Sequence, residues 1–410
     1  MKDPLAFNPF DPAEAHGMWD VAAALRRQGP VVRLANGFVF ASRYAAARTV
    51  LLESRTFCAQ GGFRPDGQYV PMEDRNIGEL DPPEHGPIRQ LARSGAGGRG
   101  VAENLRPFVR AHAEQLLDTL VAAGGGDLIT GYGLALTNLV IAQLLGVPLE
   151  DSPKLAHWTE EVVSSNTTGG PKDSARGRAD AFPDFIGYVD GLIEARLSAE
   201  TAPQDAITRI VQTGIEDAEL PVPMVRMILV NLLLGGTATT RDTIGNLLHE
   251  LIVHHDLHER LRADRSLVPA AVEESLRLAP PVLFVLRRTT ESTLLGGLDV
   301  SPGERILVAI ASANRDEEIY PEAETFSLDR VDPEPHLSFG HGAHLCVGAA
   351  LSRMEVQEAL DVFLDRFAPG DLAHARGFEF AHVPVPFLFG PQSVDVTLTP
   401  RFHEESPHAR

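Results

Sequence analysis

One ten-residue segment, Phe339-Gly340-His341-Gly342-Ala343-His344-Leu345-Cys346-Val347-Gly348, constrains this chain more than any other part of its sequence. It leads directly into an amphipathic pattern from Ala349 to Phe367, so Cys346 is predicted to lie at the N-terminus of a helix. Unpaired backbone N–H groups and the positive end of the helix dipole favour an anionic sulfur there. The glycines allow loop angles closed to other residues and let a flat partner approach the backbone. The segment therefore predicts a ligand thiolate, and the alternative is an inert core cysteine beside a glycine-rich turn.

Two further patterns stand upstream of this segment. Glu274 and Arg277 are one helical turn apart, where an ion pair can form, although this spacing is common by chance. The apolar stretch from Pro223 to about His254 predicts a long helix that crosses the core, and it contains Gly235-Gly236-Thr237-Ala238-Thr239-Thr240. A glycine inside a helix costs about 1 kcal/mol relative to alanine, so the pair indicates a packing or functional cause.

The ten-residue segment matches the haem-binding signature F-G-x-G-x-H-x-C-x-G at every fixed position, and the chain resembles the cytochrome P-450 family over nearly its whole length. Glu274 and Arg277 match the E-x-x-R pair of that family, and Arg330 stands at the position that completes it. The resemblance implies that these three residues are structural. It also covers Asp81-Pro82-Pro83-Glu84-His85 with Arg89, and Ala313-Asn314-Arg315-Asp316.

The resemblance implies haem b as the cofactor, with Cys346 as the ligand of its iron. A haem carries two propionate carboxylates, which require cationic or N–H donors, and arginine is the strongest of these. Arg287 is preferred over Arg288 for this role because of its spacing to Gly296-Gly297. The residues that the resemblance assigns to the cofactor are Cys346, His85, Arg89, Arg287, His344, Phe339, Gly340 and Gly348.

The glycine-containing stretch resembles the oxygen-activating region of the family, which implies catalytic positions at Gly235, Gly236, Ala238 and Thr239. Ala238 stands where the family has an acid that relays protons, and alanine has no titratable group. Three alternatives follow: water ordered by Thr237 or Thr240 carries the protons, a polar group of the substrate assists, or the enzyme uses peroxide or an atypical reaction. Asp242, four residues later on a similar helix face, is a candidate for partial replacement.

The activity implied by the resemblance is monooxygenation: one atom of O2 enters a C–H bond of a small, largely apolar organic molecule, in secondary metabolism or catabolism. The chain shows no flavin or ferredoxin-like extension, so a separate ferredoxin and its NAD(P)H-dependent reductase are the expected partners, with Arg93 and Arg353 as docking candidates. A non-catalytic haem-thiolate sensor or binding protein is the alternative. The candidate substrate pocket comprises Leu234, Thr237, Leu283, Phe284, Phe387 and Leu388, with Tyr69, Val70 and Met72 as a candidate lid.

Composition excludes several other classes of protein. The chain has 36 Lys and Arg against 56 Asp and Glu, a formal net charge of −20, which argues against a general nucleic-acid binder. Two cysteines are too few for a disulfide framework. The N-terminus lacks the pattern of a signal peptide and no run of about 18 apolar residues occurs, so a cytoplasmic protein without a membrane partner is expected.

The expected fold class is mainly α with small β-sheets (α+β): a single domain over residues 1–410, with a triangular helical body and the haem between the long central helix and the cysteine-loop helix. Asn36-Gly37 predicts a short hairpin. Apolar spacing predicts helices near 102–122, 132–146, 181–198, 222–253 and 347–367, and short strands within 293–310 and 383–397.

Two other sequence patterns are not assigned a function. The stretch from Gly95 to Gly100 fits G-x-G-x-x-G but follows a helical pattern instead of a strand, so a flexible loop between two helices is predicted. His249, His254, His255 and His258 cluster near the end of the long helix, where a solvated helix terminus explains them better than a metal site.

Overall fold

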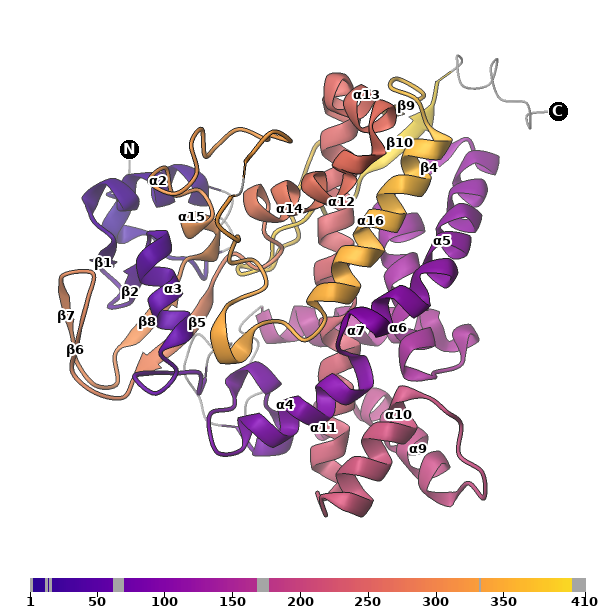
Figure 1. Cartoon of the computed structure of the whole chain (residues 1–410), viewed down its shortest axis with the longest axis horizontal. Helices are drawn as coiled ribbons and strands as arrows, with labels where there is room; N and C mark the ends of the chain where they lie inside the picture. The colour runs from indigo at the N-terminus through magenta and orange to yellow at the C-terminus, as the bar shows by residue number, and fades with distance from the viewer. Residues whose placement is uncertain are drawn as a thin grey trace.

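The structure, a computed structural model, describes residues 3–11, 14, 17–61, 70–167, 177–331 and 333–399. It is mainly helical with small sheets, as the sequence predicts. Figure 1 shows the strands β1, β2, β5 and β8 with α2, α3 and α15 on one side of the molecule, and most of the longer helices on the other. The assignment of residues 1–410 to one domain stays a prediction.

The α-helices and the shorter helical turns are as follows. The α-helices are α2 (Met18–Gln28), α3 (Tyr44–Leu52), α4 (His85–Ala96), α5 (Arg99–Ala122), α6 (Ala135–Leu145), α7 (Ser152–Thr167), α8 (Arg178–Ala181), α9 (Pro183–Ser198), α10 (Ala206–Val211), α11 (Val222–Gly235), α12 (Ala238–Val253), α13 (His255–Ala263), α14 (Val268–Leu278), α15 (Ile310–Ala313) and α16 (Ala349–Arg366). The shorter turns are η1 (Pro4–Ala6), η2 (Met72–Asp74), η3 (Ile77–Glu79), η4 (Ile129–Leu134), η5 (Leu149–Asp151), η6 (Gln212–Asp217), η7 (Arg265–Leu267) and η8 (Gly342–His344).

The largest sheet has the strand order β1-β2-β8-β5-β3. Its predicted hairpin is confirmed: Val31 pairs with Ala41 in antiparallel register, and Gly37 takes the positive φ of 87° that its turn requires. β2 pairs in parallel with β8, whereas β5 runs antiparallel to both β8 and β3. The strands of this sheet are β1 (Val31–Arg33), β2 (Val39–Ala41), β3 (Phe57–Cys58), β5 (Val285–Thr289) and β8 (Arg305–Val308).

Two smaller sheets complete the β structure: β4 (Gly125–Asp127), β10 (Asp395–Leu398) and β9 (Leu372–His374) form one, and β6 (Thr293–Leu295) with β7 (Leu298–Val300) form the other. The prediction of strands within 383–397 is only partly right, because β10 alone falls there. The preceding residues form turns with two isolated bridges, Val282 to Leu388 and His382 to Pro391.

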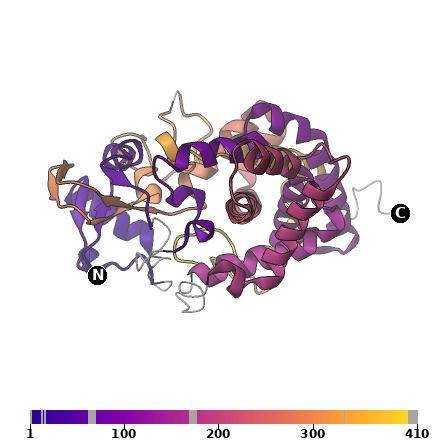
Figure 2. The same cartoon turned by 90° about the horizontal axis from the view of Figure 1, so that it is seen from below.

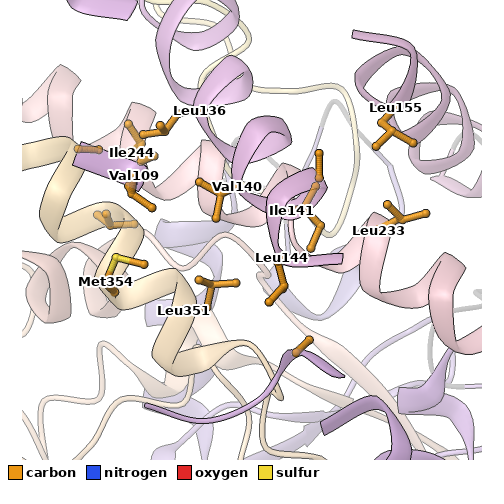
Figure 3. Packing of buried hydrophobic residues seen from close by; sticks show 14 of the residues in the cluster. Val109, Leu136, Val140, Ile141, Leu144, Leu155, Leu233, Ile244, Leu351 and Met354 are labelled. Carbon is orange, nitrogen blue, oxygen red and sulfur yellow. The ribbon is translucent and has the colours of Figure 1, made fainter. Parts of the chain in front are cut away.

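The main hydrophobic core lies where α5, α6, α12 and α16 meet, as Figure 3 shows for some of its side chains. Val109 of α5, Val140 of α6, Ile244 of α12 and Met354 of α16 are each 3% exposed or less. Full burial of one such side chain contributes roughly 1.5–3 kcal/mol. This packing fixes α16, and therefore the segment that contains Cys346, relative to α12.

The long central helix consists of two segments, which corrects the expectation of one helix from Pro223 to His254. α11 ends at Gly235 and α12 begins at Ala238, with Gly236 and Thr237 in a turn between them, although the N–H of Gly236 still donates to the carbonyl oxygen of Leu232. Figure 2 looks along α11, with other helices placed around it.

One helical stretch in the described part of the chain, Val222–Val253, is long and apolar enough to cross a membrane. Its apolar residues have another explanation, since Met227, Ile228, Leu247 and Leu251 lie in the main core. The stretch is accounted for by packing inside the protein.

The glycine-rich stretch from Gly95 to Gly100 is only partly a loop, so that prediction needs correction. Gly95 is inside α4, and a Cβ there would lie 2.4 Å from Cδ1 of Ile210 on α10. The glycine is required because two helices approach closely at this point. Only Gly97 and Gly98 separate α4 from α5.

The four histidines near the end of α12 are dispersed. Among the described residues no group of three or more histidines, cysteines or carboxylates could hold a metal ion. His249 packs against Phe380, with ring centroids 4.4 Å apart, and His254 pairs with Glu250. The prediction of a solvated helix terminus is wrong for His258, because its side chain is buried. It is 3% exposed, and its Nε2 lies 3.1 Å from the carbonyl oxygen of Phe367.

The buried His258 predicts a loss of stability in acid. Burial lowers the pKa of His258 to about 4, from 6.5, so the unfolded chain binds more protons than the folded chain between these values. Stability should therefore fall as the pH falls through this window. In urea titrations at about pH 7 and about pH 4, we expect wild type to lose up to about 3 kcal/mol more unfolding free energy than His258→Gln. Equal losses in the two proteins would contradict this assignment.

Candidate active site

The segment before α16 is a tight loop that presents Cys346. Gly340 and Gly342 take positive φ values of 70° and 68°, and a Cβ at Gly342 would lie 2.8 Å from the carbonyl oxygen of Leu51. The backbone N–H of Cys346 donates to the carbonyl oxygen of Phe339 at 2.8 Å. The two glycines therefore have steric reasons for their positions, as the sequence predicts for this loop.

The sulfur of Cys346 lies at the start of α16, whose N-cap is Gly348. The backbone N–H groups of Gly348 and Ala349 donate hydrogen bonds to it. Burial raises the pKa of the thiol, while these two donors and the nearby Arg89 and Arg353 act in the opposite direction. Cys346 is nevertheless an exposed residue, so it remains accessible to a partner. This environment suits a thiolate held by a cation.

Three donors from separate elements gather close to this loop: His85 at the start of α4, Arg287 on β5 and His344 in η8. The rings of His85 and His344 are tilted against each other with centroids 4.1 Å apart. Nε2 of His85 and both ring nitrogens of His344 are buried without a hydrogen-bond partner among the described residues. Arg287 is 5% exposed, and its Nη1 donates to the carbonyl oxygen of Leu286 at 2.8 Å.

Among the residues that the structure describes, no carboxylate forms an ion pair with these donors. Burial lowers the pKa of Arg287 to about 10. Burial, with repulsion from Arg287, His85 and Arg89, lowers the pKa of His344 to about 3. A buried cluster of this kind fits a ligand that carries carboxylates, since such a ligand would satisfy the unpaired nitrogens. Arg288 is only partly buried and pairs on the strand with Cys58, so the geometry favours Arg287.

Arg89 lies on α4 next to the cysteine loop, and its Nη2 donates to the carbonyl oxygen of Leu345. Burial lowers the pKa of Arg89, and the neighbouring Cys346 acts in the opposite direction. Arg89 therefore joins the donor cluster to the residue that precedes the cysteine.

A second charged cluster lies behind the loop. Glu274 accepts from Nε and Nη2 of Arg277, both at 2.8 Å, and from Nε of Arg330 at 2.9 Å. Burial alone raises the pKa of Glu274, but its bonds to the two guanidiniums outweigh burial and leave the pKa below its usual value. The structure thus brings these three residues together as predicted.

Asn314 connects this charged cluster to the cysteine loop. Arg277 donates to its carbonyl oxygen at 2.9 Å, while Oδ1 of Asn314 accepts from the backbone N–H of Leu337 at 2.7 Å. Nδ2 of Asn314 donates to Ser338 at 2.8 Å. Asn314 is completely buried, so the loop before Cys346 is supported by a satisfied polar network.

The sequence model of the cytochrome P450 family matches residues 4–370. This chain belongs to the cytochrome P450 family. It is 28% identical to a steroid C26-monooxygenase of Mycolicibacterium smegmatis, over 92% of this chain and 91% of that protein. It is 32% identical to the mycinamicin IV hydroxylase/epoxidase of Micromonospora griseorubida, over 80% of this chain and 81% of that protein. The ligand-free structure of cytochrome P450 TbtJ1 matches with a TM-score of 0.82 at 30% identity, covering 94% of this chain and 98% of that chain.

As a P450, the chain is a monooxygenase whose cofactor is haem b, bound through a thiolate. The unpaired nitrogens of His85 and His344, with the buried Arg287, fit the two propionates of that group. The exposed, hydrogen-bonded sulfur of Cys346 fits its iron. The donor set of this structure is therefore compatible with the cofactor of the family.

The interruption between α11 and α12 carries the residues that are predicted to take part in oxygen activation. A Cβ at Gly236 would lie 2.8 Å from Cδ1 of Ile141, so a larger residue would have to displace this side chain of α6. A Cβ at Gly235 would meet nothing within 4 Å, which leaves open space beside this residue. Oγ1 of Thr239 lies 3.4 Å from the carbonyl oxygen of Gly235 and is partly exposed. Its hydroxyl is thus held only weakly by the helix.

The other predicted pocket residues divide into three pairs. Leu234 and Thr237 lie at the helix interruption, and Thr237 is the N-cap of α12. Leu283 and Phe284 lie in a separate hydrophobic cluster with the N-terminal segment, and Phe284 packs against Phe10 at 5.6 Å between ring centroids. The remaining two are placed by the C-terminal turns: Phe387 packs against that same cluster and Leu388 bridges to Val282. Core packing accounts for Leu283 and Phe284, so a substrate role stays a prediction for them.

The two candidate residues for ferredoxin docking, Arg93 and Arg353, differ in their surroundings. Arg353 donates to both carboxylate oxygens of Glu273, at 2.6 and 2.9 Å, and lies over the ring of Phe339 at 4.4 Å. Arg93, in the last turn of α4, is exposed. Of the candidate lid, Tyr69 lies outside the described residues, Val70 is buried, and Met72 begins η2.

Sequence reasoning missed the partners that surround Asp242. Arg241 donates to Asp242 and also to Glu160 on α7, more than eighty positions earlier in the chain. No local pattern could indicate that contact. It also missed Glu355 on α16, which is 2% exposed and whose Oε1 has no partner among the described residues.

Proposed function

We propose that this P450 oxygenates a small, largely apolar organic molecule of steroid or macrolide type, with electrons from a separate ferredoxin and its NAD(P)H-dependent reductase. In the balanced reaction one oxygen atom of O2 enters the substrate and the other leaves as water, with two electrons from NAD(P)H and two protons taken up at the site. The observation that carries the proposal is the sulfur of Cys346, hydrogen-bonded by Gly348 and Ala349 and open to a partner.

The cofactor would be held from two directions. Cys346 supplies the sulfur ligand, and the loop residues Phe339, Gly340 and Gly348 position it. Arg287, His85 and His344 would hold the propionates, with Arg89 beside them. When bound, the haem supplies the site at which dioxygen is reduced and activated, and a thiolate ligand favours cleavage of the O–O bond.

On the opposite side, Thr239 would orient dioxygen through its weakly held hydroxyl, and Gly235 leaves space next to it. Ala238 cannot hold or pass a proton. Protons must therefore reach this side from another group, which distinguishes this chain from the family pattern. The substrate would lie near Leu234 and Thr237.

The substrate class is proposed from the relatives. The two curated relatives described above are named for a steroid and for the macrolide mycinamicin IV, and each matches most of this chain. An apolar ligand of that size would bury extensive surface and displace water from the site. We propose a role in secondary metabolism or steroid catabolism, in the cytoplasm.

The substrate class and the electron source are tested together. A panel of steroids, macrolides, terpenes and fatty acids should be titrated into the purified protein, and ligands of the first two groups are expected to shift its spin state. With ferredoxin, reductase and NAD(P)H, a ligand that shifts the spin state should be oxygenated.

The exposed Arg93 is our docking candidate for the ferredoxin. Arg93→Glu should raise the KM for an acidic ferredoxin about tenfold at low salt, with a smaller effect at high salt.

Arg353→Glu is not a matched control, because Arg353 is held by Glu273. Arg27→Glu, in the last turn of α2, alters a charge on another part of the surface and should leave the KM for ferredoxin unchanged. Equal effects of the two variants would contradict docking at Arg93.

Ala238 is the one observation that favours a second function, because the acid that relays protons is absent at this position. In that function the protein would bind a gas or small molecule at its haem without turnover. In that case ligands would shift the spin state, but no oxygenated product would form with any electron source. Product formation from a single member of the panel excludes it.

A further inference from the structure

We propose that the buried carboxyl of Asp242 supplies protons to the oxygen side of the site, one helical turn beyond the alanine that replaces the acid of the family. The proposal rests on the monooxygenase function proposed above and names the residue that makes it possible. Ala238 and Asp242 are four residues apart on α12, so their side chains lie on the same face of the helix, about 5–6 Å apart at Cβ.

The carboxyl of Asp242 has one bound oxygen and one free oxygen. Nε and Nη2 of Arg241 both donate to Oδ1, at 2.9 and 2.8 Å. Oδ2 is buried and has no hydrogen-bond partner among the described residues. A buried oxygen without a partner is costly, so its presence indicates either a functional role or a water molecule. Arg241 is thus a positioning residue that leaves Oδ2 available.

The chain makes room for this carboxyl. A Cβ at Gly390 would lie 2.4 Å from Cγ of Asp242, so only glycine permits the side chain to occupy its position. One turn further along α12, Asn246 donates to the carbonyl oxygens of Ala279 and Phe389 at 3.4 and 3.2 Å. These bonds hold the turn that carries Gly390 against the same face of α12, where Asp242 is completely buried.

Two charged groups act on the carboxyl of Asp242, and one of them, Glu160, reaches the protein surface. Arg241 donates through Nη1 to Glu160 of α7 at 3.0 Å, and the side chain of Glu160 is 51% exposed. Burial raises the pKa of Asp242; Arg241 lowers it and Glu160 raises it, and the net direction is upward. The carboxyl therefore holds a proton at a higher pH than an exposed aspartate does.

The proton transfer is balanced without another reagent. The O–H bond at Oδ2 breaks, the proton passes through one bridging water to the reacting oxygen beside Thr239, and a carboxylate remains. A proton from solvent then restores the acid along the polar side of α12 where Arg241 meets Glu160. Arg241 stabilises the carboxylate between these two steps.

Glu355 is the competing buried acid. Burial raises its pKa well above the usual value, and its Oε1 also has no partner among the described residues. It lies on α16, the helix that follows Cys346, whereas Asp242 lies on the same helix as Thr239. We therefore assign the proton supply to Asp242 and use Glu355 as the comparison.

The experiment compares Asp242→Asn, the double variant Asp242→Asn with Ala238→Asp, and Glu355→Gln. The amide at position 242 retains an oxygen for Arg241, so the fold should be preserved. We expect Asp242→Asn to lower the rate of product formation about 100-fold, as loss of a general acid does, with more peroxide per NAD(P)H. The double variant should regain most of the lost rate, because it returns an acid to the family position, and Glu355→Gln should resemble wild type.

An infrared measurement supplies a readout that does not depend on turnover. The C=O stretch of a protonated carboxylic acid should be present in wild type near neutral pH and reduced in Asp242→Asn. Full coupling in Asp242→Asn, or a loss that Ala238→Asp does not restore, would overturn the proposal. The red-shifted Soret band of the reduced protein with CO separates these outcomes from failure of the proposed function, since its absence in wild type would refute the latter.

Discussion

Replacing Cys346 with serine is expected to abolish the strongly red-shifted Soret band of the reduced protein with CO and to reduce monooxygenation to background. In this variant a hydroxyl replaces the thiol, and a serine hydroxyl ionises far less readily than a thiol. The backbone N–H groups of Gly348 and Ala349 would remain but would have no thiolate to stabilise. Absorption spectra of the reduced protein with CO, together with product formation, measure both effects.

Cys58→Ser is the matched control, because Cys58 is the other cysteine of the chain and lies on β3. The control should retain the red-shifted band at wild-type intensity. A variant at Cys346 that kept this band would refute the ligand assignment. Loss of the band in both variants would show that the substitution acts through the fold instead of the ligand.

The cysteine side of the site could be predicted from sequence because its determinants are local. Gly340, Gly342 and Cys346 lie within seven residues, and their roles follow from backbone angles and from the start of α16. Glu274 and Arg277 are one turn apart in the same helix. In these cases the sequence spacing itself determines which groups meet.

The oxygen side depends on contacts between distant segments, which the sequence does not reveal. Arg241 meets Glu160, and Gly390 leaves the space into which Asp242 fits. Gly236, at the interruption of the central helix, likewise lies close to Ile141 of α6. Glycine at each of these positions is visible in the sequence, but the neighbour that requires it becomes known only when the helices are packed.

The same distinction explains the errors of the sequence analysis. The stretch from Gly95 to Gly100 is predicted as a loop between two helices, yet Gly95 lies inside α4, where it approaches Ile210 of α10. Tertiary packing outweighs local preference at this position. Phe284 packs against Phe10 in the N-terminal cluster, and its role at the substrate stays a prediction.

Replacement of Arg277 by methionine should have the largest effect on stability. The change leaves Glu274 buried with Arg330 as its remaining guanidinium partner, and it removes the donors to the carbonyl oxygens of Asn314 and Ala323. Loss of one partner from a buried ion pair typically costs about 3–5 kcal/mol. We expect the free energy of unfolding to fall by that amount and the haem content to fall with it, because Asn314 supports the loop that carries Cys346.

Arg260→Met provides the comparison, because Arg260 pairs with Asp329 next to Arg330 but both side chains are largely exposed, at 49% and 69%. An exposed pair contributes little, since water screens its charges, so this variant should unfold as wild type does. The methionine side chain is the same in both variants, and therefore the difference between them measures burial of the charge. If Arg277→Met were no less stable than Arg260→Met, Glu274 would not depend on its guanidinium partners, and the cysteine loop would have to be held by its own backbone hydrogen bonds.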